Sequence, residues 1–455
     1  MKAINKDILK LAIPSILANI TVPIVGMVDI AVAGHLDANA ATMIGGIAIG
    51  TMLFDLLYWN FGFLRVGTGG LTAQAFGKGD RTECARIFAR AVGIALACAL
   101  ALIVIQWVFV KAAFLVVDCT PEVRQLASQY FFIRIWAAPA TLSLMAFKGW
   151  FIGMQDSVRP MAVDLTVNGM NVLMSFMLAL GFPPLGFEGI GFAGIAAGTV
   201  VAQYSGLLVA VLLMLLKYRR STMSALSASD LRDVFKGSET RRFFVMNTDL
   251  FVRSLCFIAI YIGFTVISAR YGDLLLAVSS IMMKLLMIFS YFTDGFAYAG
   301  EAMTGRYIGA GDSRMLRQTV KWTFVWSMGI AVIFMGIYHF AGVPLLRMMT
   351  SDAAVVEAAR GYLPWLLLMP VIGCAAFTWD GIYIGATASR QIRNSMLWAV
   401  VGFAFVWFAG IYGLNLFRPS DYDCAAMHIL MAAYFAHLLA RTIYLSVRYR
   451  RTVHI

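Results

Sequence analysis

The sequence predicts an all-α membrane protein with twelve transmembrane helices arranged in two lobes of six. Three observations predict this fold class. Of the 455 residues, 61% are hydrophobic and 13% are charged, and the mean hydropathy is +0.80, which is typical of proteins that cross a bilayer many times. Apolar segments of bilayer length alternate with short charged or Gly/Pro-containing loops. The second half of the chain also repeats sequence features of the first half.

Twelve apolar segments are each long enough to form a membrane-spanning helix. They are residues 8–34, 43–70, 86–115, 121–147, 160–181, 189–216, 243–267, 274–302, 319–342, 353–385, 393–416 and 425–447. Basic residues gather in alternate loops, such as those around Lys78, Lys217 and Arg314. The opposite loops hold isolated charges such as Lys111 and Arg270. The positive-inside rule therefore predicts that both termini are cytoplasmic, and we expect the protein in the cell inner membrane.

A polar stretch divides the chain near its middle. Residues 217–242 form the predicted cytoplasmic linker, which separates an N-terminal six-helix lobe, residues 1–216, from a C-terminal six-helix lobe, residues 243–455. Within the linker, residues 221–237 have a spacing that suits an interfacial amphipathic helix, and a solvated linker is the alternative.

The two lobes repeat each other at a constant spacing. The segment 76–80, FGKGD, matches 308–312, IGAGD, with an offset of 309 − 77 = 232 residues. The segment 149–153, GWFIG, matches 381–385, GIYIG, at the same offset, as does Tyr130 with Tyr362. Since each half has an even number of helices, the repeat is parallel, and transporters of this build place substrate between their halves. No strand precedes either GxGD loop, so tight helix–helix turns are favoured over phosphate binding.

The first apolar segment contains a single charge, Asp29, and two prolines, Pro14 and Pro23. A carboxylate in a spanning helix costs on the order of 3 kcal/mol and is tolerated where it faces protein or water. Each proline removes a helix donor and can bend the helix. The segment is therefore interpreted either as a hinged element that senses a proton or cation, or as a kinked helix with a structural Asp.

Polar residues in the fifth and sixth segments accompany Asp29. Asp164, Asn168, Asn171 and Ser175 follow one another at spacings of four, three and four, which place them on one helix face. Thr199 lies on the sixth segment. A carboxylate with amide and hydroxyl groups nearby can hold a proton or a small cation. Hydrogen bonding between helices is the alternative for the neutral residues.

The second lobe carries a larger set of polar and charged residues inside its apolar segments. They are Asn247, Asp249, Arg253, Lys284, Asp294, Glu301 and Asp380. We expect Asp249 and Arg253, four residues apart, to form a structural ion pair because buried charges must be neutralised. We expect Lys284, Asp294, Glu301 and Asp380 to form one network, either a second ion relay or part of the substrate cavity.

Several functional classes are disfavoured by the sequence. The six cysteines show no metal-ligand or disulfide spacing, so neither a metal site nor a cofactor is expected. The net charge of +12 comes from loops between apolar segments and does not indicate nucleic-acid binding. Neither HExxH nor GxSxG is present, which argues against an intramembrane enzyme. A flippase for lipid-linked precursors is a second transport hypothesis, but it should line its cavity with Arg and Lys, whereas the deep residues here are mostly acids.

The chain resembles the multidrug and toxic compound extrusion (MATE) family, and its DinF-like branch in particular. The resemblance covers nearly the whole chain. Its matching stretches are residues 14–34, 63–80, 168–171, 247–253, 294–312 and 380–396. It implies two six-helix lobes and export of organic compounds driven by proton or sodium entry. It also implies that Asp29, Asn171 and Thr199 belong to the ion site and that Pro14 is associated with a helix bend.

One position departs from the family pattern. Many members carry an Asp four residues after the Asn that corresponds to Asn171, and Ser175 stands there in this chain. The missing carboxylate favours protons over sodium as the coupling ion. We therefore expect a monomeric secondary antiporter that exports small, cationic or amphiphilic organic compounds in exchange for protons, with sodium as the alternative ion.

Overall fold

The computed structural model describes residues 2–34, 36, 40–115, 117, 119–182, 184, 186–225, 234–350, 352–417 and 421–453. These residues are almost entirely helical, and twelve helices are long and apolar enough to cross a membrane. The predicted all-α class and the number of spans are confirmed. Two strands of two residues each, β1 (Gly181–Phe182) and β2 (Phe187–Glu188), pair antiparallel in the connection between the fifth and sixth spans.

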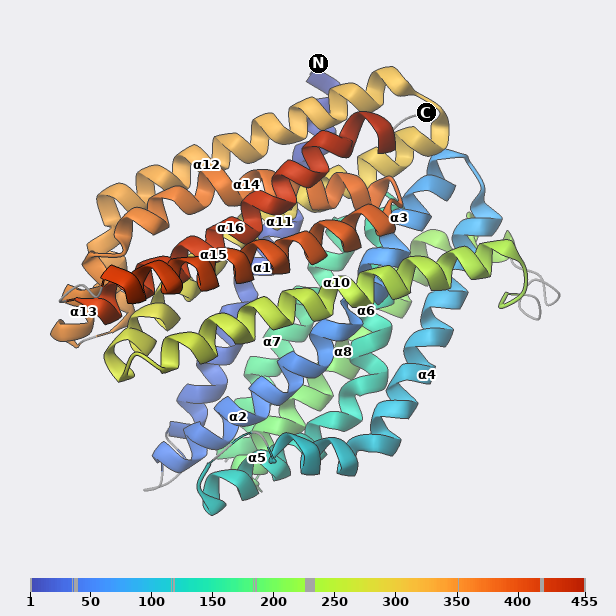
Figure 1. The fold of residues 1–455 in the computed structure, drawn as a ribbon. Helices are drawn as coiled ribbons and strands as arrows, with labels where there is room; N and C mark the ends of the chain where they lie inside the picture. Colours follow the sequence, from blue (N-terminus) through green and yellow to red (C-terminus); the bar gives the residue numbers. More distant parts are fainter. Residues whose placement is uncertain are drawn as a thin grey trace. The chain divides into compact units, whose positions relative to one another are not determined.

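The helices of the first half are α1 (Lys2–Gly34), α2 (Ala40–Trp59), α3 (Phe63–Gly77), α4 (Arg81–Ala113), α5 (Pro121–Arg134), α6 (Ala138–Gly153), α7 (Val158–Leu180) and α8 (Phe192–Tyr218) (Figure 1). Those of the second half are α10 (Ser238–Ala269), α11 (Asp273–Ala310), α12 (Ser313–Met349), α13 (Ala353–Arg360), α14 (Leu363–Gly385), α15 (Ser389–Phe417) and α16 (Tyr422–Thr452). Short 3₁₀ turns occur at Asn60–Gly62, Ile135–Ala137 and Met223–Ala225.

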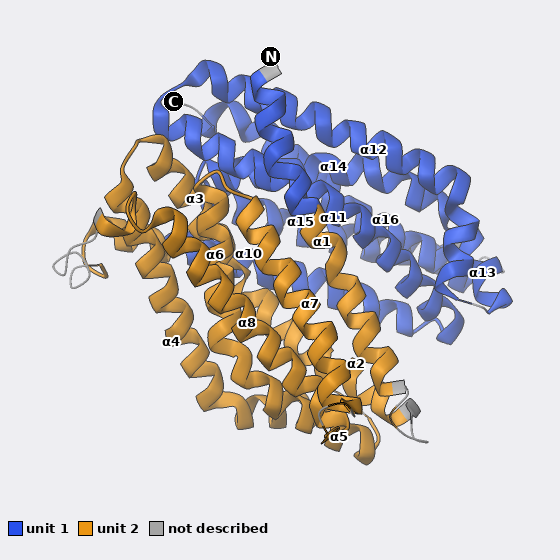
Figure 2. Ribbon diagram, turned by 180° about the vertical axis from the view of Figure 1, so that it is seen from behind, with its two compact units in different colours: residues 1–16, 245–455 blue, residues 17–244 orange. Residues whose placement is uncertain are grey.

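The chain divides into two compact units (Figure 2). Unit 2 comprises Leu17–Phe244, and unit 1 comprises Met1–Ile16 together with Val245–Ile455. Helix α1 therefore contributes its first half to unit 1 and its second half to unit 2. It is helical from Lys2 to Gly34, so neither Pro14 nor Pro23 ends it. The predicted role of these prolines as hinges stays a prediction.

Three predicted spans are interrupted in the structure. The predicted single helix over residues 353–385 is wrong: it consists of two helices, α13 and α14, which are separated at Gly361 and Tyr362. Pro364 lies at the start of α14, where its missing N–H costs no internal helix bond. The spans over 43–70 and 121–147 each contain a 3₁₀ turn, and in the second of these Pro139 follows the turn directly.

The 232-residue repeat extends to the close packing of helices. A Cβ added at Gly149 on α6 would lie 2.1 Å from the carbonyl oxygen of Arg65 on α3. A Cβ added at Gly381 on α14 would lie 2.1 Å from the carbonyl oxygen of Ala297 on α11, and Ala297 is itself 232 residues after Arg65. Both helix pairs therefore approach until backbones touch, and only glycine fits at these positions.

The two GxGD segments are the tight turns that the sequence favoured. Gly79 and Gly311 have φ values of +76° and +72°, a left-handed conformation that glycine adopts at no steric cost. Asp80 accepts a hydrogen bond from the backbone N–H of residue 83 at 2.8 Å, and Asp312 accepts one from that of residue 315 at 2.9 Å. Each aspartate thus caps the following helix.

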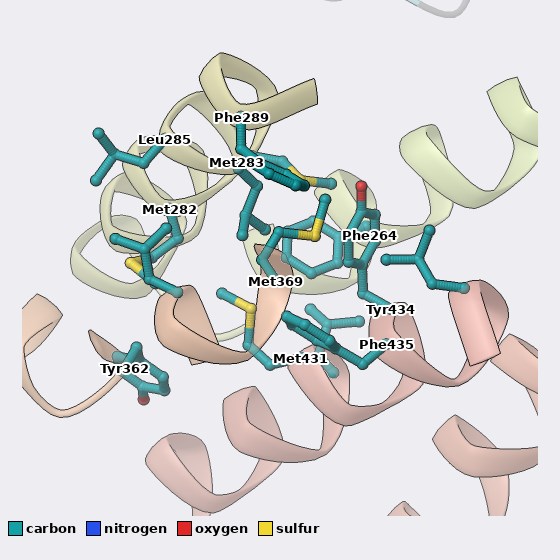
Figure 3. Close-up of a cluster of buried hydrophobic side chains, with 14 of the residues drawn as sticks. Phe264, Met282, Met283, Leu285, Phe289, Tyr362, Met369, Met431, Tyr434 and Phe435 are labelled. Atoms are coloured by element: carbon teal, nitrogen blue, oxygen red, sulfur yellow. The ribbon is translucent and has the colours of Figure 1, made fainter. Parts of the chain in front are cut away.

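Each unit has its own apolar core. In unit 1, methionine and aromatic side chains from α10, α11, α14 and α16 interleave, and Figure 3 shows Met369 beside Phe264 and Met431 beside Phe435. These residues are at most 3% exposed. In unit 2, Phe54 stacks on Phe131 at a ring separation of 4.7 Å. Residues 226–233 of the predicted linker lie outside the described residues, so the predicted interfacial helix remains a prediction.

Candidate functional site

Small residues allow α7 and α8 of unit 2 to approach closely. A Cβ added at Gly194 would lie 2.4 Å from the backbone of Leu178, and one added at Gly198 would lie 2.7 Å from the backbone nitrogen of Ser175. Interfaces between membrane helices use small residues in this way because close backbone contact maximises packing. The approach brings Thr199, the residue after Gly198, to the polar face of α7.

The structure brings the four predicted ion-site residues together in unit 2. The hydroxyl of Ser175 on α7 donates a hydrogen bond to Oδ1 of Asp29 on α1 at 3.0 Å. Nδ2 of Asn171, one turn earlier on α7, donates to Oγ1 of Thr199 on α8 at 2.9 Å. All four residues are buried, with at most 6% of each side chain's residue exposed. Three helices therefore meet around one carboxylate.

The amide oxygen of Asn171 is the acceptor left over in this group. It is buried, and it has no hydrogen-bond partner among the described residues. A buried carbonyl oxygen is costly unless it is paired. Toward the other end of this face, Nδ2 of Asn168 donates to Oγ1 of Thr21 on α1 at 2.5 Å. The face of α7 thus binds the second half of α1 at two levels.

Asp164 does not take part in the ion site. It forms an ion pair with Lys148 on α6. Both side chains are partly exposed, at 20% and 29% respectively. The second carboxylate on the predicted polar face of α7 is therefore neutralised by a lysine and not aimed at Asp29.

The predicted Asp249–Arg253 ion pair in unit 1 is wrong. Asp249 on α10 accepts hydrogen bonds from Arg393 at 2.6 Å and from the hydroxyl of Ser389 at 2.7 Å, both at the start of α15. Arg253 donates instead to Oδ2 of Asp380 on α14 at 2.9 Å. Contacts between helices won over the neighbour four residues away because partners on other helices reach the buried carboxylates directly.

Asp380 is paired with two arginines. Arg441 on α16, 1% exposed, also donates to Oδ2 of this carboxylate. The arrangement satisfies the rule that buried charges are paired and hydrogen-bonded, and it assigns Asp380 to an ion cluster that joins α10, α14 and α16.

The predicted four-residue network in unit 1 is not formed as one group. Lys284 is exposed, whereas Glu301 on the same helix is fully buried. The two are 301 − 284 = 17 residues apart on α11, which corresponds to about 25 Å along a helix axis. Asp294 is half-buried between them, and Asp380 is held by arginines from α10 and α16. Asn247 is buried on α10 away from these pairs.

Three basic residues inside spans escaped the sequence analysis: Lys148 and Arg441, described above, and Arg134 on α5. The Arg134 guanidinium donates to the hydroxyl of Tyr130 at 3.0 Å and lies 4.7 Å from the centre of the Phe54 ring. Its charge acts on the carboxylates of both Asp29 and Asp55. The rule that an ionisable residue in a spanning helix is functional applies to basic residues as much as to acids, and it would have found all three.

A further ion cluster lies outside the spans, in the turn between α6 and α7. Asp156 accepts hydrogen bonds from Lys217 and Tyr218, both at 2.8 Å, and from Arg159 at 2.5 Å. Burial by itself raises the pKa of Asp156, but the hydrogen bonds from Lys217 and Tyr218 and the positive charge of Lys217 outweigh it and hold the pKa below its usual value. This cluster fixes the end of α8 to the start of α7.

Within the described residues there is no group of three or more His, Cys, Asp or Glu side chains that would hold a metal ion. The ion site of unit 2 offers one carboxylate, two hydroxyls and one amide. Such a set binds and releases a proton readily, because one titratable group with hydrogen-bonding neighbours is enough.

Comparisons with known proteins agree on one family. A sequence model of the MatE family matches residues 14–177 and 250–412. The DNA damage-inducible protein F of Escherichia coli is 33% identical over 402 residues, which cover 88% of this chain and 84% of that protein. A probable multidrug resistance protein NorM of Photorhabdus laumondii is 24% identical over 463 residues, covering 98% of this chain and 96% of that protein.

Solved structures give the same fold. One of them is titled as the outward-facing conformation of a multidrug resistance MATE family transporter of the MOP superfamily, and it matches with a TM-score of 0.84 over 99% of this chain and 96% of that chain. Its sequence identity is 14%, so the likeness concerns the fold. The two-lobed arrangement expected from the 232-residue repeat is thus the fold of known transporters.

Proposed function

Because this chain belongs to the MatE family of multidrug and toxic compound efflux transporters, we propose that it is a secondary antiporter that exports organic compounds in exchange for protons, with Asp29 as the residue that carries the proton. The family consists of membrane transporters and not of enzymes. The observation that carries the proposal is the buried carboxylate of Asp29, which α1 presents to Ser175 of α7 beside the Asn171–Thr199 pair.

The two protonation states of Asp29 require different partners. The ionised carboxylate only accepts hydrogen bonds, and the Ser175 hydroxyl supplies one. The protonated carboxyl also donates, and the amide oxygen of Asn171 is a buried acceptor on the next turn of α7. Protonation thus changes which packing of α1 against α7 is preferred. A coupling ion shifts a conformational equilibrium only through such a difference in affinity.

Helix α1 is placed to transmit that change. The boundary between the units falls between Ile16 and Leu17, and Pro14 and Pro23 lie on either side of it. Each proline removes one backbone donor from the helix and lowers the cost of bending there. The first half of α1 packs closely on α11, since a Cβ added at Gly295 would lie 2.8 Å from the carbonyl oxygen of Ala12. Bending at these prolines would move Asp29 while this contact stays in place.

The ligand set favours protons over sodium. A bound metal cation of this kind is surrounded by several oxygen ligands, usually including more than one charged group. The ion site contains one carboxylate, and Ser175 stands where many relatives have a second. Asp164, the other acid on this face of α7, is neutralised by Lys148. We therefore propose protons as the coupling ion.

Transport by the purified protein in proteoliposomes tests the proposal. A fluorescent lipophilic cation such as ethidium is the substrate, and the pH and sodium gradients are imposed separately. Asp29→Asn keeps the shape of the side chain and loses its titration, so we expect proton-driven export to fall to the level of empty vesicles. Ser175→Ala is the matched control, because it removes the hydrogen bond and keeps the carboxylate, and gradient-driven export should persist.

Two results would contradict the proposal. Wild-type export by Asp29→Asn under a proton gradient would exclude Asp29 as the coupling residue. Export driven by sodium at a fixed, equal pH would exclude the ion assignment. Folding of each variant is checked by its elution profile in detergent, so that loss of transport is not confused with loss of the protein.

We also propose the remaining features of the transport unit. The basic residues in alternate loops favour a cytoplasmic membrane location with both termini inside the cell. The acidic residues at the level of the ion site, Asp29 and Asp55, favour cationic or amphiphilic substrates over acidic ones. A single chain contains both lobes and the ion site, so we propose a monomer as the functional unit.

A further inference from the structure

Arg134 is a charged residue within a membrane-spanning segment that has no ion pair. Among the described residues, no carboxylate oxygen lies within 4 Å of its guanidinium. Its hydrogen bond goes to the hydroxyl of Tyr130 at 3.0 Å. An arginine in a spanning helix is costly, and such residues normally pair with acids. A cation kept at this depth without a close counter-ion therefore calls for an explanation other than simple neutralisation.

Aromatic side chains hold the guanidinium in place. It lies 4.7 Å from the ring centre of Phe54 and 5.5 Å from that of Tyr130, and both of these residues are fully buried. The ring of Phe54 stacks on Phe131 at 4.7 Å. Gly50, one turn before Phe54, lets α2 approach the Tyr130 ring, since a Cβ added there would lie 2.6 Å from that ring. Cation–π contacts with buried rings fix the charge at one position.

The titratable groups around Arg134 come from several helices. Asp29 lies on α1, Asp55 and Tyr58 on α2, and Tyr130 on α5 itself, and all four interact electrostatically with Arg134. Tyr204 on α8 acts on Tyr58. Of the residues facing Asp29 from α7, Ser175 is neutral. The charges at this level of unit 2 are thus two carboxylates and one fixed cation.

We propose that Arg134 is a positioning residue for ion coupling: its fixed positive charge stabilises the ionised carboxylate of Asp29 and thereby sets the proton concentration at which Asp29 releases its proton. The inference rests on the proposed function, in which Asp29 carries the proton. A single hydroxyl donor, that of Ser175, compensates little for a charge removed from water. A cation at a fixed distance supplies the rest, and because it is not in contact with Asp29, it leaves that carboxylate free to titrate.

The pH dependence of transport separates this role from a structural one. The initial rate of ethidium export by proteoliposomes is measured at a series of pH values on the side where the proton is released, at a constant pH difference. In Arg134→Gln the ionised form of Asp29 is less favoured, so the midpoint of the pH profile should move by roughly one pH unit to higher pH. Arg134→Lys keeps the charge and should keep the wild-type midpoint, whatever its maximal rate.

A matched control lies on the same helix. The guanidinium of Arg124 lies 4.9 Å from the centre of the Phe114 ring, and Arg124 is exposed near the start of α5. Arg124→Gln removes an arginine with the same kind of aromatic contact and should leave the midpoint unchanged. An unchanged midpoint in folded Arg134→Gln, or an equal shift in Arg124→Gln, would overturn the proposal.

Two further variants complete the test. If Arg134→Gln does not fold, Asp55→Asn decides: it leaves Arg134 to act on Asp29 alone, so the midpoint should move to lower pH, and an unchanged midpoint would overturn the proposal. Asp29→Asn distinguishes the two levels of the argument. Proton-driven export by Asp29→Asn would refute the proposed function itself, whereas an inactive Asp29→Asn with an unshifted Arg134→Gln would refute the role of Arg134 alone.

Discussion

Replacing Gly149 or Gly381 by alanine should destabilise the protein by similar amounts, although the two positions lie in different lobes. The added Cβ would lie 2.1 Å from a backbone carbonyl oxygen in both cases, whereas ordinary contacts begin at 3.4 Å. Each helix pair, α3 with α6 and α11 with α14, must therefore separate by about 3.4 − 2.1 = 1.3 Å. A backbone oxygen cannot rotate away as a side chain would, so neighbouring contacts along the crossing are lost as well.

The size of the effect follows from two opposing contributions. Overpacking a close contact costs about 1–3 kcal/mol, and a clash with backbone lies at the upper end of that range. Alanine is favoured over glycine in a helix by about 1 kcal/mol. The net loss in the free energy of unfolding is therefore about 2 kcal/mol for each variant, which corresponds to a fall of several degrees in melting temperature.

Thermal melting of the detergent-solubilised protein measures this loss, with Gly329→Ala on α12 as the matched control. A Cβ added at Gly329 meets nothing within 4 Å, so this variant should be as stable as the wild type or slightly more stable. If Gly149→Ala melts together with Gly329→Ala, the backbone contact is not as close as described. If only one of Gly149→Ala and Gly381→Ala is destabilised, the structural equivalence of the two lobes is refuted.

Three other predictions follow from the topology and the ion clusters. A cysteine placed at Asp312 should react with impermeant reagents from the cytoplasmic side, and labelling from outside alone would refute the proposed orientation. Asp156→Asn should lower the free energy of unfolding by about 1–3 kcal/mol, since Lys217 and its other donors lose a charged acceptor. Because the pKa of Asp156 is lowered in the folded protein, its contribution is present above the unfolded value near 3.8 and is lost as pH falls through the lower folded value, so a denaturation series between pH 3 and 7 should show wild type and variant converging in acid. Asp380→Asn should cost about 3–5 kcal/mol by leaving Arg441 unpaired, and melting no lower than that of Asp29→Asn would show that this cluster does not stabilise unit 1.

Much of the fold was predictable from the sequence because the bilayer restricts what a chain can do. Apolar segments of bilayer length must form helices, so counting them predicted twelve spans. The repeat offset predicted that Gly149 and Gly381 are equivalent, and both meet a carbonyl oxygen at the same distance. Asp29 was identifiable because a lone carboxylate in a spanning helix needs a reason to be there. Its group with Asn171, Ser175 and Thr199 depended on the spacing along α7 and on the family resemblance.

The pairing of buried charges was decided only by the tertiary structure. Spacing along one helix suggested Asp249 with Arg253, but Asp249 binds Arg393 and Arg253 binds Asp380. A spacing of four residues shows that two side chains share a helix face, but it does not show which other helix packs on that face. The role of Arg134 became visible for the same reason. Its aromatic contacts and its proximity to two carboxylates arise from α1, α2 and α5 packing together, and no local pattern encodes that arrangement.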